Sequence, residues 1–390
     1  MEECQRNIDN TVSTGKEDQE KIDYWKACII QCQGLITYAH RMAEEAECQA
    51  ASCTDEKRKK EELIRKGCKM IQEGQANPGF FNDYAAMKMT LGKGCTIEEA
   101  RDWTIVGCIQ PGPGGGSTDG SPDAGYVNMG KMIEFVLHNG VDPRTGKLMG
   151  LQTGDPREFK NIEEFKDALK KQILHHYKLV TTGYNIMQGI HMLRYPVIFA
   201  SMVTKGCVES GKSVQQGGAK YSTAGLFITG AANMADSIAA IEKCVYEDKD
   251  ITMDELIDAL DHNFEGQERM RQLLLNKPEK FGNDEAHVDG IYREMMHFIA
   301  DEVQQWPDAR GGHYSFNVHS QTVNVSHGAV CGATPDGRLS GEPFCDNAII
   351  LNHLFLNGRD VFLRIPAICI CADSSQSELR LPLLQVVSSN

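Results

Sequence analysis

The chain has 390 residues, of which 41 % are hydrophobic, and its formal net charge is -14. This length indicates one large domain or two to three ordinary ones. The negative charge argues against nucleic acid as a partner, because phosphates require Lys and Arg. No apolar run reaches the length of a membrane span, and the N-terminus lacks the basic and apolar regions of a signal peptide. We therefore expect a cytoplasmic protein that binds neither nucleic acid nor membrane.

The 14 cysteines are scattered along the chain. A chain of this length does not need disulfides to form a stable core, so reduced thiols are the better interpretation. The pairs Cys28/Cys32 and Cys369/Cys371 have no second pair at zinc-finger spacing. We predict no metal site at either pair.

The N-terminal residues 1–75 have helical hydrophobic spacing, and the charge-dense run 55–66 is interpreted as a solvated helix face. Pro78 is expected to end this region. A short helix over Tyr84–Leu91 follows. Thr96 and Glu99 then form a capping box at the start of another helix, which leads into the next strand.

That strand, Thr104–Val106, runs into Gly107 and Cys108 and is followed by a loop of Pro and Gly as far as Gly116. The pattern places a thiol on a tight loop at a strand end, where α/β proteins often carry their chemistry. On this observation alone, a buried small hydrophobe is the competing interpretation of Cys108.

The remaining elements alternate between helices and strands, which indicates an α/β architecture built on parallel strands. No linker or repeat divides the chain, so we expect one folded body. The predicted helices are 127–137 with a C-cap at Gly140, 161–180, 233–246, 252–264 and a long helix ending at Val303. Residues 195–202 are predicted to be buried, and strands are predicted within 217–230 and over 314–325. Thr334–Arg338 is predicted to be a turn, within a segment Thr334–Pro343 that lies at the surface or rim.

Three other motifs were weighed. The pair His175-His176 is interpreted as a surface pair rather than a metal site. Gly114–Gly116 lacks the Lys-Ser/Thr of a phosphate-binding P-loop. Arg310–Gly312 is interpreted as a turn, with substrate contact as the alternative.

Four separated stretches together resemble the glycyl radical enzymes, the pyruvate formate-lyase-like family. These stretches are Phe81–Asp83, Gly107–Pro111, Gly282–Glu285 and Cys331–Pro343. The resemblance implies an α/β fold, a partial ten-stranded β/α barrel of the glycyl radical enzyme type with a helix-rich exterior. By the same match, Cys108 is the catalytic residue, whose thiyl radical takes hydrogen from a small organic substrate.

In this family an S-adenosylmethionine iron–sulfur activase installs a radical on a glycine, and no cofactor is bound permanently. The resemblance therefore implies this activase and a small-molecule substrate as partners, and a homodimer. The radical glycine was not found, because none of the 37 glycines lies in the family's radical-loop context. A non-enzymatic remnant is the alternative to a glycyl radical lyase or synthase.

The chain also departs from the family's pattern at Cys-x-Glu, where the glutamate serves as a base. Here Gln110 takes that place, and an amide cannot accept a proton at neutral pH. This favours arylacetate decarboxylase-like or alkyl/arylsuccinate synthase-like chemistry over a dehydratase or choline lyase. Gln110 and His138 are the predicted substrate-binding residues.

The predicted organisation has a helical segment over 1–75, a partial barrel domain over 76–361 and an atypical tail over 362–390. Barrel strands that the family carries upstream are expected to be missing at about Leu63–Ile71.

Overall fold

The computed structural model describes residues 2–12, 15–16, 18–30, 83–106, 110–115, 123–283, 285–318 and 322–345. Its centre is a three-stranded sheet of β3 (Asp123–Asn128), β6 (Thr223–Thr229) and β7 (His313–Asn317) in the order β3-β6-β7. Both pairs of strands are parallel, which confirms the predicted α/β class. The closure of ten strands into a barrel stays a prediction.

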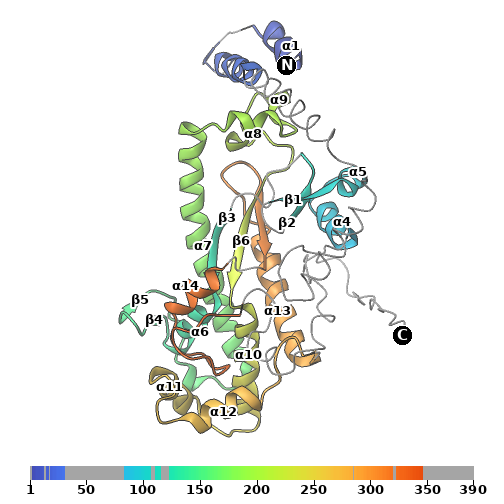
Figure 1. Ribbon diagram of the computed structural model, residues 1–390. Coiled ribbons are helices and arrows are strands. Elements are labelled where there is room, and N and C mark those ends of the chain that lie inside the picture. The colour runs from blue at the N-terminus through green and yellow to red at the C-terminus, as the bar shows by residue number, and fades with distance from the viewer. Residues whose placement is uncertain are drawn as a thin grey trace, which may run out of the picture.

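One face of this sheet is covered by helices (Figure 1). The long helix α7 (Ile162–Arg194) packs against β3, and α13 (Ala286–Val303) packs against β7 and α10 (Ala231–Ile241). Helix α6 (Met129–Leu137) follows β3 directly and packs on α7. Alternate strand residues point into this layer and are fully or almost fully buried: Val127, Ala224, Leu226, Ile228 and Tyr314. The apolar half of each strand therefore forms the core with the helices.

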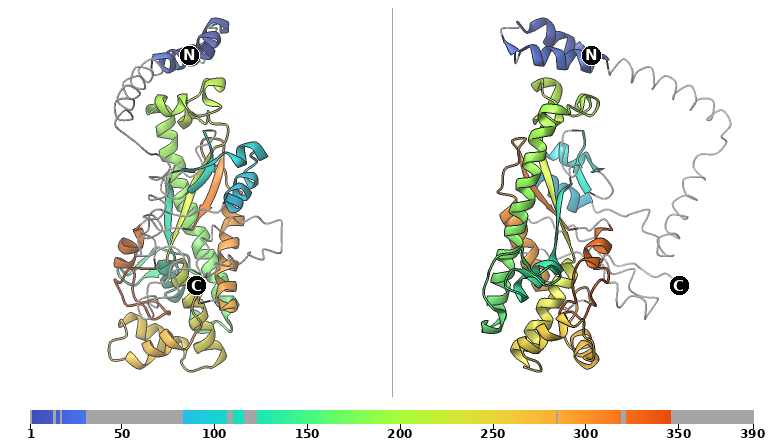
Figure 2. Two further views of the ribbon diagram at one scale, coloured as in Figure 1. Left: turned by 45° about the vertical axis from the view of Figure 1, so that its right-hand side comes forward. Right: turned by 90° about the vertical axis from the view of Figure 1, so that its left-hand side faces the viewer.

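The opposite face of the sheet looks toward a small hairpin unit. Strands β1 (Trp103–Val106) and β2 (Gln110–Pro113) pair antiparallel, and α4 (Asp83–Gly92) and α5 (Ile97–Arg101) pack beside them. Figure 2 shows this unit and α7 on opposite sides of the sheet.

The other elements lie around this arrangement. Residues 18–30 are helical, and Trp25 packs with Ile198 and Met202 and donates a hydrogen bond from Nε1 to the Val208 oxygen, 2.9 Å away. The remaining bounds are α1 (Glu2–Asn10), β4 (Val141–Asp142), β5 (Lys147–Leu148), η1 (Pro156–Glu158), α8 (Ile198–Met202), α9 (Cys207–Ser210), η2 (Val214–Gln216), η3 (Glu242–Glu247), α11 (Met253–Asp261), α12 (Glu268–Asn276) and α14 (Val323–Ala329).

Several predicted boundaries were wrong. Helix α6 begins at Met129 rather than residue 127, because Val127 belongs to β3 and Asn128 is the N-cap. At its other end Asn139 takes the left-handed conformation with φ +47°, and the Gly140 amide donates to the Phe135 oxygen at 2.7 Å. The C-cap is therefore His138, two residues before the predicted Gly140, and Gly140 closes a Schellman motif as the second residue after the cap.

Two further predictions failed because tertiary contacts overrode the local pattern. Residues 195–202 were expected to be buried, yet Tyr195 is 64 % and Phe199 49 % exposed. The strand expected over 314–325 ends at Asn317, and α14 occupies its second half.

The segment Thr334–Pro343 was predicted to lie at the surface or rim, and this is wrong for its first half, the turn Thr334–Arg338, whereas residues 340–343 are exposed. The first half is a turn, with Gly337 at φ +92° and the Thr334 amide donating to the Arg338 oxygen at 3.1 Å. However, Thr334 is 1 %, Asp336 7 % and Arg338 2 % exposed. The polar groups are buried because they bond one another and α10, as detailed in the Discussion.

Candidate active site

Capping interactions of helix α5 and side-chain contacts of Glu99 position the hairpin. Thr96 accepts a hydrogen bond from the Glu99 amide, and the Glu99 carboxylate accepts one from the Thr96 amide, which confirms the predicted capping box of α5. Helix α5 then feeds β1. Glu99 also binds Lys220 Nζ and the Tyr221 hydroxyl at 2.6 Å each, so it joins the hairpin unit to the segment that leads into β6.

The predicted Pro/Gly loop after Cys108 is in part a strand. Val106 pairs with Gln110 and Trp103 with Pro113, so the chain between the paired strands is residues 107–109. A two-stranded sheet has an open edge on each strand, which is where proline is tolerated. Cys108 itself and the side chain of Gln110 lie outside the described residues, and their assignment stays a prediction.

The face of the central sheet that looks toward the hairpin is polar. The register sets Tyr126 opposite Phe227 and Phe227 opposite Asn317, while Asn128 lies opposite Thr229. The rings of Tyr126 and Phe227 stack with centroids 4.8 Å apart. These residues alternate along the strands with the apolar residues that face the helices. Because successive side chains of a strand point to opposite faces, the same strands form both the core and this polar surface.

Three polar groups on this face are buried and lack a hydrogen-bond partner within the part of the chain that the structure describes. They are Thr229 Oγ1, Ser315 Oγ and Asn317 Nδ2. Native proteins leave few such groups, because each costs about 1–3 kcal/mol. Their clustering on one face indicates that a ligand, water or further chain satisfies them.

The carboxyl ends of β3 and β6 carry a second set of contacts. Asn128 Oδ1 accepts the Lys131 amide at 3.1 Å and caps α6, while its Nδ2 donates to the His327 oxygen at 3.0 Å. His327 Nδ1 is buried without a partner among the described residues, and burial lowers the pKa of this histidine. A neutral imidazole can donate and accept one proton each.

Sequence reasoning missed these residues as site candidates. The alternation Ser315-Phe316-Asn317 was visible, but it does not reveal which face a hairpin will cover. The sequence signal that could have found them is polar residues at period two on strands whose other face is strongly apolar.

The predicted contact His138 lies elsewhere. Its Nδ1 lies 2.8 Å from the Glu134 oxygen and its Nε2 2.8 Å from Asp261 Oδ1, at the C-cap of α6. The nine residues of α6 separate it from the strand end by about 14 Å at 1.5 Å per residue. The structure therefore does not bring His138 to the polar face, and both its ring nitrogens are engaged.

Other candidates have structural roles. Burial raises the pKa of Cys331 to about 12, and the nearby Glu134 adds to this, so Cys331 stays a neutral thiol. The His176 ring stacks on Phe135 at 5.1 Å. No group of three or more His, Cys, Asp or Glu residues that could hold a metal occurs in the described ranges, nor do those ranges include a helix long and apolar enough to cross a membrane.

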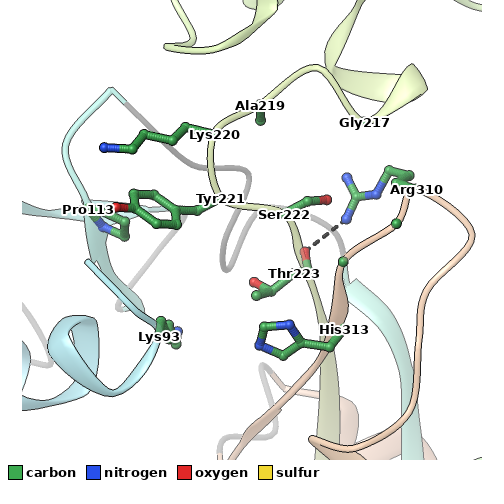
Figure 3. A pocket seen from close by; sticks show the side chains of 12 residues that line it. Lys93, Pro113, Gly217, Ala219, Lys220, Tyr221, Ser222, Thr223, Arg310 and His313 are labelled. Atoms are coloured by element: carbon green, nitrogen blue, oxygen red, sulfur yellow. Dashed lines mark hydrogen bonds between the residues drawn. The ribbon is translucent and has the colours of Figure 1, made fainter. Parts of the chain in front are cut away.

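A cavity of about 240 Å³ opens at the amino ends of β6 and β7, between these strands and the base of the hairpin (Figure 3). Arg310–Gly312, weighed above as a turn or a substrate contact, lines it. Because Trp103 and Pro113 are the open end of the hairpin, this cavity lies about 10 Å from Val106 and Gln110, at 3.3 Å per strand residue.

Comparison with known proteins identifies relatives over most of the chain. The family model described as "Pyruvate formate lyase-like" matches residues 1–63 and 60–328. Trans-4-hydroxy-L-proline dehydratase of Clostridioides difficile is 34 % identical over 74 % of this chain and 36 % of its own length. Isethionate sulfite-lyase of Bilophila wadsworthia is 33 % identical over 71 % and 34 %, and indoleacetate decarboxylase of Tractidigestivibacter scatoligenes is 30 % identical over 74 % and 35 %.

The comparison with solved structures also identifies a related enzyme. The chain superposes on the B12-independent glycerol dehydratase of Clostridium butyricum with a TM-score of 0.69 and 34 % identity, covering 73 % of this chain and 36 % of that one. The chain spans about a third of the length of the curated relatives that it matches.

Proposed function

Because the chain belongs to the pyruvate formate lyase-like family, we propose that it carries the cysteine half of a glycyl radical lyase. In this proposal the thiyl radical of Cys108 takes a hydrogen atom from a small organic substrate. The radical glycine belongs to polypeptide other than these 390 residues, since none of the 37 glycines has the expected loop context.

The observation that carries the proposal is the polar face of the sheet. The hairpin that contains Cys108 lies over the only described sheet face whose buried hydroxyl and amide groups lack partners, those of Thr229, Ser315 and Asn317. Such groups suit a substrate with several polar atoms, because each can bond it without first breaking a protein hydrogen bond. The apolar opposite face is filled by helices and offers no such place.

The chemistry then balances as a radical chain. The glycyl radical takes the hydrogen atom of the Cys108 thiol, and the resulting thiyl takes one from a substrate carbon. The substrate radical loses a leaving group from the neighbouring carbon, and the product radical takes the hydrogen atom back from the thiol. Burial in a site that excludes water protects these radicals from side reactions.

The comparisons do not confirm the reaction subtype favoured from sequence, a decarboxylase or succinate synthase. The relatives named above include a dehydratase and a sulfite-lyase at 34 % and 33 % identity and a decarboxylase at 30 %. We therefore propose an elimination. Gln110 cannot act as a base, which favours an elimination that needs no proton removed from the substrate at this position.

The remaining features of the proposal rest on the family resemblance. They are a homodimer in the cytoplasm, activation by an S-adenosylmethionine iron–sulfur enzyme, and the division into 1–75, 76–361 and 362–390. The last range lies outside the described residues. The two separate family matches, which meet at residues 60–63, support a junction near the predicted one.

A chimera tests the proposal. Residues 83–128 would replace the matching segment of the C. difficile trans-4-hydroxy-L-proline dehydratase, which is then activated without air. We expect a glycyl radical signal and measurable turnover. Cys108→Ala should keep the signal and abolish product, whereas Cys95→Ala, a buried thiol in the same graft, should keep both.

The role of Gln110 is tested in the same chimera. Gln110→Glu should raise the rate of dehydration by about 10²–10⁴-fold if this position supplies the missing base. Product formation by the Cys108→Ala chimera would refute the assignment of the thiyl. An unchanged rate in Gln110→Glu would refute the argument that a base is missing at this position.

A further inference from the structure

The cavity at the base of the hairpin has a lining whose charged side chains are all cationic. Lys93, Lys220 and Arg310 border it, together with His313, and no Asp or Glu does (Figure 3). The nearest carboxylates bind these cations from outside the lining: Glu99 accepts from Lys220, and Asp308 Oδ2 lies 3.3 Å from Arg310 Nη2. The cavity therefore presents positive charge to whatever enters it.

Arg310 is the best-built part of this lining. The residue is only 7 % exposed, and its Nη2 donates to the Thr223 oxygen at 2.8 Å. Its Nε is buried and has no acceptor within the described residues. A guanidinium carries five donors in a planar fork that matches carboxylate and phosphate oxygens. Because hydrogen bonds fix the Arg310 side chain and its Nε donor is unused, this residue is well placed to bind an oxyanion.

Ser222 supplies a second unused group. Its hydroxyl is also buried without a partner among the described residues, and its side chain points toward Arg310 across the cavity wall. The Arg310 Nε and the Ser222 hydroxyl are therefore both buried beside this cavity without a hydrogen bond among the described residues. Each lowers the stability of the fold unless a bound molecule forms the missing hydrogen bond.

Two glycines in this wall allow neighbouring backbone segments to approach closely. A Cβ on Gly312 would lie 2.0 Å from the Ser222 oxygen, and one on Gly217, at φ +76°, would lie 2.2 Å from the Arg310 oxygen. Any side chain at either position would force the two segments apart. The backbones that carry Ser222 and Arg310 are thus locked together, which fixes the distance between their side chains.

We propose that this cavity binds a small oxyanion, held by Arg310, Ser222 and Lys93. Its volume of about 240 Å³ leaves room for a phosphate or a short carboxylate. The site lies at the amino end of the polar sheet face, because His313 precedes Ser315 by two residues on β7, and it is at the opposite end of the hairpin from residues 107–109. A bound anion would join Lys93, in the turn before α5, to the amino ends of β6 and β7.

Titration of the full chain tests this proposal. Inorganic phosphate and acetate would be titrated separately by calorimetry, with chloride holding the ionic strength constant so that general screening is excluded. We expect saturable binding at one site for at least one of them, and the comparison of the two identifies the class of anion.

Variants identify the site. Ser222→Ala removes a hydroxyl that has no hydrogen-bond partner among the described residues, so it should leave stability unchanged while weakening binding about tenfold, the loss of one bond to a charged group. Lys93→Gln and Arg310→Lys should weaken binding at least as much. Lys147→Ala, an exposed lysine on β5, is the matched control and should bind as the unmodified chain does.

Two results would overturn the proposal. One is the absence of saturable binding of both anions at millimolar concentration. The other is binding to Ser222→Ala and Lys93→Gln with the affinity of the unmodified chain, which would place the anion elsewhere. Far-UV circular dichroism confirms in each case that the variant is folded.

Discussion

Substitution of Asp336 by Ala is expected to destabilise the fold strongly, although sequence alone placed this residue in a surface turn. The Asp336 carboxylate accepts hydrogen bonds from Asn233 Nδ2 at 2.7 Å and from the Thr334 hydroxyl at 2.5 Å. Asn233 in turn accepts the Cys345 amide at 2.9 Å, so this carboxylate links the turn, α10 and the end of the described chain.

The magnitude follows from these contacts. Two bonds to a buried charged group contribute about 1.5–3 kcal/mol each, and their loss leaves buried donors without an acceptor. The buried Arg338 amide, whose nitrogen lies 3.5 Å from Asp336 Oδ1, also loses an acceptor. We expect Asp336→Ala to lower the free energy of unfolding by about 3–5 kcal/mol, as for a broken buried network.

The assay is urea unfolding followed by circular dichroism at pH 7. Asp254→Ala is the matched control, because Asp254 is 76 % exposed and forms a surface ion pair with Arg157 at 2.6 Å. Such pairs contribute at most about 1 kcal/mol. The reasoning is refuted if Asp336→Ala costs as little as Asp254→Ala, or if it changes ligand affinity more than stability.

Three other outcomes are expected. Burial raises the pKa of Asp236 to about 7, so the folded state holds a proton that the unfolded state releases near pH 4, and stability should fall as the pH rises from 4 to 7. Asp236→Asn should flatten this dependence in urea titrations at pH 5 and 8, and an equally steep profile would exclude Asp236 as its source. Gly130→Ala should cost about 1–3 kcal/mol, because its Cβ would lie 2.3 Å from the Phe344 ring. Gly183→Ala in α7, where nothing lies within 4 Å, should instead stabilise by about 0.5–1 kcal/mol; equal effects of the two substitutions would contradict the packing argument.

Local chemistry made much of the fold predictable. The capping box at Thr96, the helix starts near residues 161 and 252 and the strand within 217–230 all lie where the sequence placed them. Each signal acts through neighbours within four residues or through strand periodicity, so no tertiary information was needed.

Features that depend on distant contacts were not predictable. Helix α7 runs to Arg194, beyond the predicted residue 180, because Tyr184 and Gln188 are buried against the body of the protein. The polar residues of Thr334–Arg338 suit a surface by composition, and only their mutual bonds permit burial.

The candidate site was predictable in one half only. The sequence predicted the strand before Gly107 and Cys108, which β1 confirms, but it predicted a loop where β2 completes the hairpin. Thr229, Ser315 and Asn317 come from strands about 100 and 200 residues further along, and only the parallel register brings them onto one face.

The most direct test of the division between a cysteine half and a separate glycine half is anaerobic electron paramagnetic resonance. The full chain is mixed with a cognate activase and S-adenosylmethionine, with and without a polypeptide that carries the family's glycine loop. We predict no glycyl doublet from this chain alone, and product formation with the added polypeptide that is lost in Cys108→Ala. A glycyl doublet from the 390-residue chain by itself would contradict the account.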